Sequence, residues 1–227
     1  MRPIYGRVAE GYLCDVPRTE YEWESAEAAH NHTYLTPAVL RTLGPANGRR
    51  LLDLGSGNGS MTVMLAKAGF KAVGAEASHT GLSAALAAFP EIEFFSQDIA
   101  DPLPAPECGI FDVVVAAEVI EHLFLPRQLF DRVNEALTPG GTLVLSTPFH
   151  GYWKNLLLAL ANKWDHHLTV GWDYGHIKFF SIPTLSAMAY ECGYELVRVD
   201  RIGRVPAVAK TMVAEFRRRP ARPDDRL

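Results

Sequence analysis

The chain has 227 residues, of which 48% are hydrophobic, and its formal net charge is −4. This length suits a single α/β domain that buries roughly 70% of its unfolded surface, so folding requires neither disulfides nor a structural metal. The hydrophobic fraction excludes an intrinsically disordered chain. The acidic balance argues against a general nucleic-acid binder, which usually carries a basic face, so we expect a small-molecule partner instead.

The cysteines and the apolar segments bear on the location of the protein. Cys14, Cys108 and Cys192 are scattered and lack CxxC spacing, which is typical of reduced thiols and predicts a cytoplasmic protein. The first ten residues contain no apolar run of the secretory kind. The longest apolar stretches, such as residues 156–161, are too short to cross a bilayer, so we expect no transmembrane segment. Nothing in the sequence indicates an oligomeric state.

The first two thirds of the chain alternate strand and helix patterns. Residues 25–43 read as a helical lead-in, in which Thr36-Pro37 suits a helix start and Gly44-Pro45 a stop. Strands are predicted at residues 50–54, 72–75, 92–95, 111–116 and 142–146, the last one after a turn at Gly140-Gly141, and helices at residues 59–68, 79–89 and 126–137. Because the strands are apolar throughout, the pattern predicts a parallel sheet with helices on both faces.

The regular pattern breaks at residues 149–175, where Trp153, Trp164 and Trp172 lie close to His166 and His167. We interpret this stretch as an irregular lid whose histidines contact substrate. A helix at 183–192, a strand at 194–199 and a last strand within 205–216 follow. The expected organisation is therefore one domain with an N-terminal helical cap at 1–46, a cofactor-binding core at 47–148, the lid at 149–175, closing elements at 176–216 and a flexible tail at 217–227 that includes the Arg217–Arg219 run.

Residues 53–59 read DLGSGNG and connect a predicted strand to a predicted helix. Glycines at such a turn let the backbone approach a ligand, and the helix start offers free N–H groups. The spacing is GxGxG, whereas dinucleotide sites use GxGxxG. Asp53 directly before the glycines would repel a pyrophosphate and attract an ammonium group. The loop therefore suits S-adenosylmethionine, which has an α-ammonium group, better than NAD.

Acidic residues follow the next two predicted strands. Glu76 ends the second strand, about twenty residues after the glycine loop, where a carboxylate can accept hydrogen bonds from ribose hydroxyls. Asp98 follows the third strand, where it can accept from an adenine amino group while Ile99 packs on the ring. Asp at a strand end is also a common turn former, and that alternative stays open.

Together with FDVV at 111–114 and LTPGG at 137–141, these residues resemble a class I S-adenosylmethionine-dependent methyltransferase. EVIEHL at 118–123 and GHIKFFS at 175–181 resemble the branch that includes the ubiquinone-biosynthesis O-methyltransferases. The resemblance covers residues 47–200. It implies an α/β fold with a Rossmann-like, seven-stranded, mostly parallel sheet whose last strand is antiparallel. The cofactor contacts that we expect are Asp53, Gly55, Ser56, Gly57, Gly59, Glu76, Ala77, Asp98, Ile99, Ala117, Glu118 and Tyr34. Tyr34 lies on the lead-in helix, and an ordinary packing role for it is an equal alternative.

Glu118, Glu121 and His122 are spaced i, i+3, i+4 after the fourth strand, so on a helix they would share one face. One interpretation is a divalent cation, Mg²⁺ or Mn²⁺, held by these three residues and His176, as in an ExxEH arrangement of small-RNA 2′-O-methyltransferases. The other, which we favour, is that no metal is used. In that case His122 is the base, with His176 as the second candidate, and Glu121 complements the helix dipole.

The expected reaction is methyl transfer from S-adenosylmethionine to a hydroxyl of a small phenolic, sugar or lipid-linked acceptor. N-methylation and RNA 2′-O-methylation are alternatives within the same fold. A nicotinamide-dependent oxidoreductase and a non-catalytic module that binds S-adenosylmethionine are alternatives of other classes.

Overall fold

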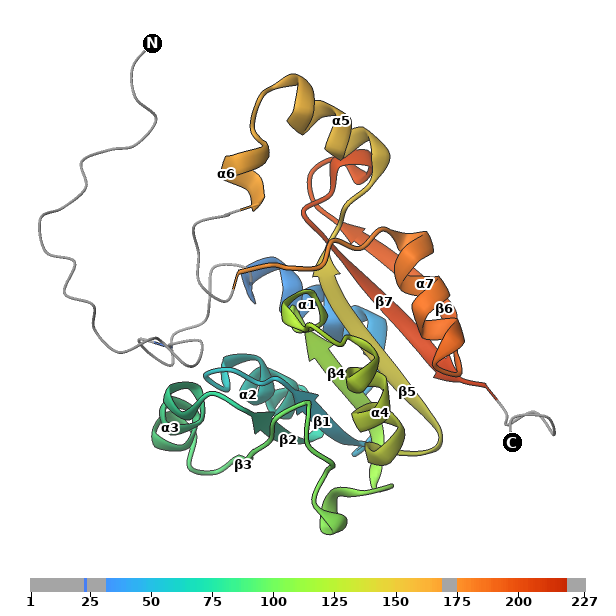
Figure 1. Ribbon diagram of the computed structural model, residues 1–227. Coiled ribbons are helices and arrows are strands. Elements are labelled where there is room, and N and C mark those ends of the chain that lie inside the picture. Colours follow the sequence, from blue (N-terminus) through green and yellow to red (C-terminus); the bar gives the residue numbers. More distant parts are fainter. Residues whose placement is uncertain (1–22, 24–31, 169–174, 220–227) are drawn as a thin grey trace, which may run out of the picture.

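The computed structural model describes residues 23, 32–168 and 175–219. Figure 1 shows a twisted sheet with helices on both of its faces. The strands are β1 (Arg50–Leu54), β2 (Lys71–Glu76), β3 (Glu93–Ser96), β4 (Phe111–Ala117), β5 (Leu137–Pro148), β6 (Tyr194–Ile202) and β7 (Thr211–Arg218). The helices are α1 (His32–Leu43), α2 (Ser60–Lys67), α3 (His79–Ala88), α4 (Arg127–Ala136), α5 (Tyr152–Leu160), α6 (Trp164–Leu168) and α7 (Ile182–Glu191), with 3₁₀ turns η1 (Ala105–Glu107), η2 (Ile120–His122) and η3 (Pro206–Val208).

The sheet has the strand order β3-β2-β1-β4-β5-β7-β6. Strands β1 to β5 pair with one another in parallel, whereas β7 is antiparallel to both β5 and β6. This confirms the seven-stranded, mostly parallel α/β fold and its antiparallel last strand. The order reverses between β1 and β4, and ligands of open α/β sheets bind beyond the carboxyl ends of the strands at such a switch point.

Two hydrophobic cores lie on opposite faces of the sheet, because alternate residues of a strand point to opposite faces. On one face, Leu52, Val114 and Leu145 pack with side chains of α4 and α7, such as Phe130 and Leu185. The other face packs against α1 and α2 and has its own buried set: Leu35, Val39, Leu51, Leu65, Val113, Val115, Val144 and Val213. Figure 1 shows α4 and α7 together on one side and α1 on the other. Burial on both faces explains why the strands lack polar alternation.

Three boundaries differ from the sequence-based expectations. Helix α1 begins at His32 and holds Pro37 in its interior rather than at its start, while residues 25–31 lie outside the described part of the chain. Gly140, with φ of 81°, lies within β5 instead of before it, because Leu137 already pairs with Phe111 and the register shifts before Thr142. The expectation that the tail begins at residue 217 is wrong, since β7 extends to Arg218. The Arg219 N–H donates to the Gly193 carbonyl, and residues 220–227 lie outside the description.

The stretch that we expected to be irregular contains two helices, α5 and α6. The sequence does not predict α5 because this helix lacks the usual apolar and polar faces. Trp153, Leu157 and Leu160 are all exposed, whereas Lys154 is buried. In Figure 1 both helices lie beyond the carboxyl end of β5. Trp172 lies outside the described residues. Within the described ranges, no helix is both long and apolar enough to cross a membrane.

Candidate active site

The glycine loop joins β1 to α2 at the switch point of the sheet. Gly55, Gly57 and Gly59 have φ values of 81°, 56° and 78°, a region that side chains rarely adopt. The N–H groups of Gly55 and Ser56 both donate to the Ala75 carbonyl at 2.8 and 3.0 Å, which ties the loop to β2. The Ser56 hydroxyl is buried and has no hydrogen-bond partner among the residues that the structure describes. The loop thus combines glycines in the left-handed region with a buried polar group that a ligand can satisfy.

Asp53 lies at the base of this loop and is only 1% exposed. Its Oδ2 accepts a hydrogen bond from the Thr62 hydroxyl on α2 at 2.7 Å. Burial raises the pKa of Asp53 to about 7, an effect that the Thr62 bond lowers and the nearby Glu76 charge increases. A cationic group bound at the loop would favour the ionised carboxylate.

Glu76 ends β2 and faces the loop. Its Oε2 accepts from the Gly57 N–H at 2.6 Å and its Oε1 from the Ser78 N–H at 2.7 Å. The carboxylate is therefore positioned by two backbone donors, beside the loop and 9% exposed. Both carboxylate oxygens are thus engaged by backbone N–H groups, and the expected role of Glu76 toward ribose hydroxyls stays a prediction.

Trp23 is a site residue that sequence reasoning missed. A Cβ built on Gly57 would lie 2.4 Å from its ring, and one built on Gly81 would lie 2.8 Å from it, so the indole packs directly on the glycine loop. Its backbone N–H donates to the Thr80 hydroxyl at 3.1 Å. A single tryptophan in a polar stretch outside the core gives no pattern from which this contact follows.

The other expected cofactor contacts lie along the same edge. The exposed Asp98 accepts a hydrogen bond from the Ala100 N–H at 2.8 Å and so forms a local turn, while Ile99 is 8% exposed and joins the core below. Ala77 is exposed after β2, and Ala117 is the half-buried last residue of β4. Their roles toward an adenine or a methionine moiety stay predictions. Tyr34 lies apart from this group, in a pocket beside Glu118.

Glu118 does not lie on a helix, so the expectation that Glu118, Glu121 and His122 share a helix face is wrong. Glu118 has a φ of 57°, and only the 3₁₀ turn η2 forms before α4 begins at Arg127. Its Oε1 accepts hydrogen bonds from the Ser146 and Thr211 hydroxyls, both at 2.8 Å. Burial raises the pKa of Glu118, against the lowering effect of these two bonds and of the Lys154 charge.

Glu121, His122 and His176 form a compact group whose possible metal ligands all lie within 4.8 Å of one another. Glu121 is completely buried, and neither of its carboxylate oxygens has a hydrogen-bond partner in the described part of the chain. Burial, with the Glu118 charge, raises its pKa well above the usual range. The Glu121 carbonyl accepts from the N–H groups of Ile177 and Lys178, which holds the segment after His176 against η2.

A pocket of about 340 Å³ opens beside Glu118, and we call it the histidine pocket. It lies where β5 passes into α5 and is closed on its other sides by α1, α6 and η3. Its lining residues are Tyr34, Glu118, Pro148, His150, Lys154, His167, Leu168, His176, Val208, Lys210 and Thr211. His167 therefore lines this pocket from α6, and its contact with a substrate stays a prediction. Because Glu118 and His176 belong to it, the pocket adjoins the Glu121–His122–His176 group.

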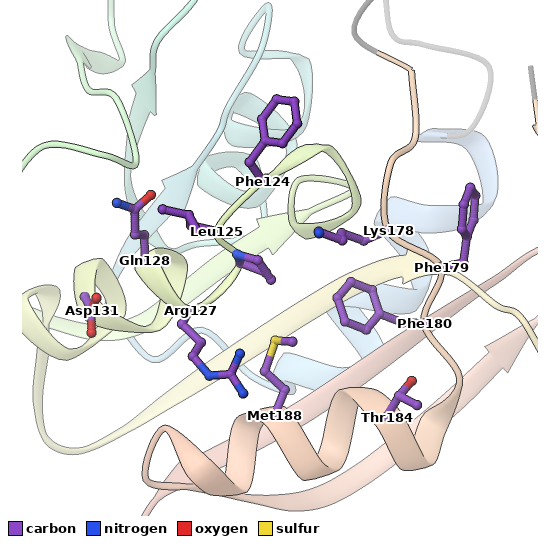
Figure 2. Close-up of a pocket in the computed structure, with 11 residues that line it drawn as sticks. Phe124, Leu125, Arg127, Gln128, Asp131, Lys178, Phe179, Phe180, Thr184 and Met188 are labelled. Carbon is purple, nitrogen blue, oxygen red and sulfur yellow. The ribbon is translucent and has the colours of Figure 1, made fainter. Parts of the chain in front are cut away.

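A second pocket of about 500 Å³, the apolar groove, lies on the other side of η2 (Figure 2). Phe124 and Leu125 lie on one wall, and Phe179, Phe180 and Met188 on the other. Phe124 is 82% exposed and Leu125 62%, which is unusual for such side chains. The groove contains no residue of the glycine loop and shares none with the histidine pocket.

The chain was compared with known proteins. A methyltransferase domain family matches residues 27–199. The ubiquinone biosynthesis O-methyltransferase of Methylococcus capsulatus is 29% identical over 196 residues, which span 78% of this chain and 83% of the relative. The enzyme of the same name from Ralstonia nicotianae is 26% identical over 160 residues, spanning 69% and 67%. That of a Caulobacter species is 34% identical over 106 residues, but this match spans only 45% of this chain and 42% of the relative.

Solved structures show the same fold. An S-adenosylmethionine-dependent methyltransferase from Mesorhizobium loti aligns with a TM-score of 0.62 at 20% identity, over 80% of this chain and 96% of that one. The magnesium protoporphyrin IX methyltransferase of Synechocystis aligns with a TM-score of 0.63 at 18% identity, over 83% and 84%. With the glycine loop, the acid after β2 and the family match over most of its length, the chain belongs to the methyltransferase domain family and is an S-adenosylmethionine-dependent methyltransferase.

Proposed function

We propose that the protein transfers a methyl group to a hydroxyl of a small acceptor bound beyond the carboxyl ends of β4 and β5. The observation that carries this proposal is the group of the buried Glu121 and the half-buried His122 and His176 next to the histidine pocket. A hydroxyl must lose its proton during methylation, and this group supplies candidate bases and ligands for that purpose. The names of the relatives, which are O-methyltransferases, support the same assignment.

The residues around the glycine loop fit S-adenosylmethionine. The Ser56 hydroxyl, which is buried and has no hydrogen-bond partner in the described part of the chain, is a polar group that a ligand can satisfy. Glu76 is oriented for ribose hydroxyls, and Asp53 favours an ammonium group. When bound, the cofactor supplies a methyl group that its sulfonium centre has already activated. The protein then has to align the acceptor and remove its proton.

His122 is the base that we favour for this proton, with His176 as the second candidate. The two rings are 4.9 Å apart in an edge-to-face arrangement. Burial, followed by the charges of His122, His167 and Lys154, lowers the pKa of His176 to about 4, so His176 is neutral at physiological pH. A neutral imidazole can accept a proton from a hydroxyl within hydrogen-bond reach.

A divalent cation is the alternative to a lone histidine base. The carboxylate of Glu121 lies in the protein interior without a hydrogen bond, which is costly unless a proton or a cation compensates it. One carboxylate and two imidazoles are a suitable donor set for Mn²⁺ or a similar ion. The residues present therefore fit such an ion, which would increase the acidity of an acceptor hydroxyl.

The surroundings support an acceptor with a ring or another apolar part. The apolar groove includes Phe124, two residues after His122, and Lys178, two residues after His176. Phenolic, sugar and lipid-linked hydroxyl compounds all stay candidates, and small-molecule O-methylation is our first choice over N-methylation or RNA methylation. Cys108 and Cys192 are free thiols, in keeping with the cytoplasmic location that we propose.

The proposal can be tested with cofactor whose methyl carbon is ¹³C. The protein is incubated with matched pairs of phenols and anilines, with catechols, and with a short RNA, and each product is analysed by NMR. An O-methyl signal from a small hydroxyl compound is expected. A signal only on nitrogen or on RNA ribose would replace the proposal with one of its alternatives. Cofactor binding without any transfer would indicate a non-catalytic module.

A further inference from the structure

The charges that line the histidine pocket are unbalanced. Lys154 and Lys210 contribute two ammonium groups, whereas Glu118 contributes the single carboxylate. Three imidazoles, those of His150, His167 and His176, complete the polar wall. We propose that this pocket binds an oxyanion, a carboxylate or a phosphate, carried by the acceptor beside the hydroxyl that is methylated. This proposal rests on the proposed function, because it assigns a substrate class to the same site.

Lys154 is the interior cation of the pocket. It is 7% exposed, and its Nζ donates to the carbonyls of Phe149 at 2.8 Å and Lys210 at 3.3 Å. An ammonium group has three hydrogens, so one donor stays available. Burial lowers the pKa of Lys154 to about 8, partly offset by the Glu118 charge, so the amine is mainly protonated at neutral pH. A buried cation is costly unless an anion compensates it.

The only acid of the lining does not form an ion pair with either lysine. The Glu118 Oε1 is already engaged by the hydroxyls of Ser146 and Thr211. Within the part of the chain that the structure describes, no carboxylate lies within 4.0 Å of the amine of Lys154 or Lys210. Among the described residues, the positive charge of the pocket is thus not neutralised by a direct ion pair.

The imidazole of His150 contributes a hydrogen-bond donor rather than a charge. The rings of His150 and His167 have centroids 5.7 Å apart, and His150 is 8% exposed. Burial, with the charges of Lys154 and His167, lowers the pKa of His150 to about 4, so it is neutral near pH 7. Each neutral imidazole retains one N–H donor, and hydrogen bonds to an ionised acceptor are stronger than those to a neutral one.

Lys210 forms the outer rim of the pocket. It is exposed, and its Nζ lies 5.5 Å from the centre of the Tyr34 ring. An exposed ammonium group at a pocket mouth attracts anions from solution, and salt screens this attraction. Since Glu118 and His176 line the same space of about 340 Å³, the anion and the reacting hydroxyl must belong to one small molecule. A hydroxy acid and a phosphorylated hydroxy compound both meet this requirement.

The test is calorimetric titration of the full chain, saturated with S-adenosylhomocysteine, with three probes of similar size. Benzoate and phenyl phosphate carry the two anions, and benzyl alcohol is the neutral match. We expect at least one anion to bind about tenfold more tightly than the alcohol, the effect of a charge-assisted contact. Whichever of benzoate and phenyl phosphate binds more tightly identifies the anion as a carboxylate or a phosphate.

Variants connect this preference to the pocket. Lys210→Ala should weaken binding of the preferred anion about threefold to tenfold, the scale of an exposed charge pair, and Lys210→Arg should restore it. Lys71→Ala is the matched control, because Lys71 is an exposed lysine at the start of β2, outside the pocket. This variant should bind the anion as tightly as the wild-type protein. Lys154→Met should abolish the preference, and its circular dichroism spectrum would check that it folds.

Equal affinity for the alcohol and both anions, or no anion binding at millimolar concentration, would overturn the inference. The same holds if Lys210→Ala behaves like Lys71→Ala. The outcome is separable from the proposed function. Fast methyl transfer to neutral hydroxyl compounds only would reject the anion site and leave the methyltransferase assignment standing. Anion binding without methyl transfer to any hydroxy acid would support the anion site and reject the proposed O-methylation.

Discussion

The Nε2 atom of His176 lies 4.0 Å from Oε1 of Glu121, although the two residues come from opposite ends of the segment that includes β5, α5 and α6. Both side chains are held where their charged forms are unfavourable: burial raises the pKa of Glu121 and lowers that of His176. A cation bound between this carboxylate and this imidazole would favour the ionised form of Glu121 and could take both groups as ligands. His122, whose ring lies 4.9 Å from that of His176, completes the group.

The metal version of the mechanism makes a prediction about ion binding. Mn²⁺ should bind to the purified protein, detected by electron paramagnetic resonance, and Glu121→Gln and His176→Asn should each weaken that binding by roughly tenfold or more. A chelator should reduce methyl transfer, and Mg²⁺ or Mn²⁺ should restore it. Glu118→Gln should have a smaller effect on Mn²⁺, because Ser146 and Thr211 already hold that carboxylate. Full activity in the chelator would leave His122 as a metal-free base.

Asp53 predicts a pH dependence of stability in the absence of cofactor. Its pKa is about 7 in the folded protein, against 3.8 for an ordinary Asp, so the folded state binds more protons between these values. The stabilising contribution of the protonated form is complete below about pH 4 and is lost as the pH rises toward 7. Asp53→Asn keeps an oxygen for the Thr62 hydroxyl and should flatten this part of the profile. Urea unfolding from pH 4 to 8 measures it, and identical slopes in both proteins would contradict the assignment.

A side chain added at Gly57 should block binding of the cofactor at the glycine loop. Gly57→Val places a branched side chain at a φ of 56°, against the Trp23 ring, and should reduce S-adenosylhomocysteine affinity at least a hundredfold. Gly109→Val is the matched control, since Gly109 also has a positive φ, 68°, but a Cβ there meets nothing within 4 Å. Calorimetric titration compares the two. Near-normal affinity in a folded Gly57→Val protein would remove the loop from the cofactor site.

The lid interpretation makes a prediction about hydrogen exchange. Peptides from α5 and α6 should exchange faster than those from β1 and β4, because the apolar side chains of Trp153, Leu157 and Leu160 are largely exposed. Binding of S-adenosylhomocysteine together with an acceptor should slow this exchange, as closure of a lid requires. Exchange as slow as in the core strands of the free protein would instead make α5 and α6 a fixed part of the fold.

The core of the fold was predictable because its signals are local. Apolar runs such as that ending at Leu54 are bounded by glycine, and Ser78, which accepts from the Gly81 N–H, caps α3 directly after β2. Such patterns depend on neighbouring residues only. The acidic residue after β2 was predictable for the same reason, since its distance from the glycine loop is fixed by one helix.

The rest of the site depends on contacts between distant segments. Glu118 was expected on a helix, but its side chain turns to Ser146 and Thr211 on β5 and β7, and the backbone adopts a positive φ. Lys154 lies in an apolar stretch, is buried, and donates to the carbonyls of Phe149 and Lys210. No periodic pattern in the sequence indicates these contacts. Trp23 reaches the glycine loop from a stretch that shows no periodicity at all.

The account is tested most directly by the rate of a single turnover in wild-type protein and in His122→Ala, with the hydroxyl acceptor that the ¹³C experiment identifies. We predict a rate about a hundredfold lower in the variant, the usual scale of general acid–base catalysis, with S-adenosylhomocysteine affinity nearly unchanged because the glycine loop and Glu76 are intact. This result is expected whether His122 acts as a lone base or as a metal ligand. A His122→Ala protein that methylates its acceptor at the wild-type rate would contradict both.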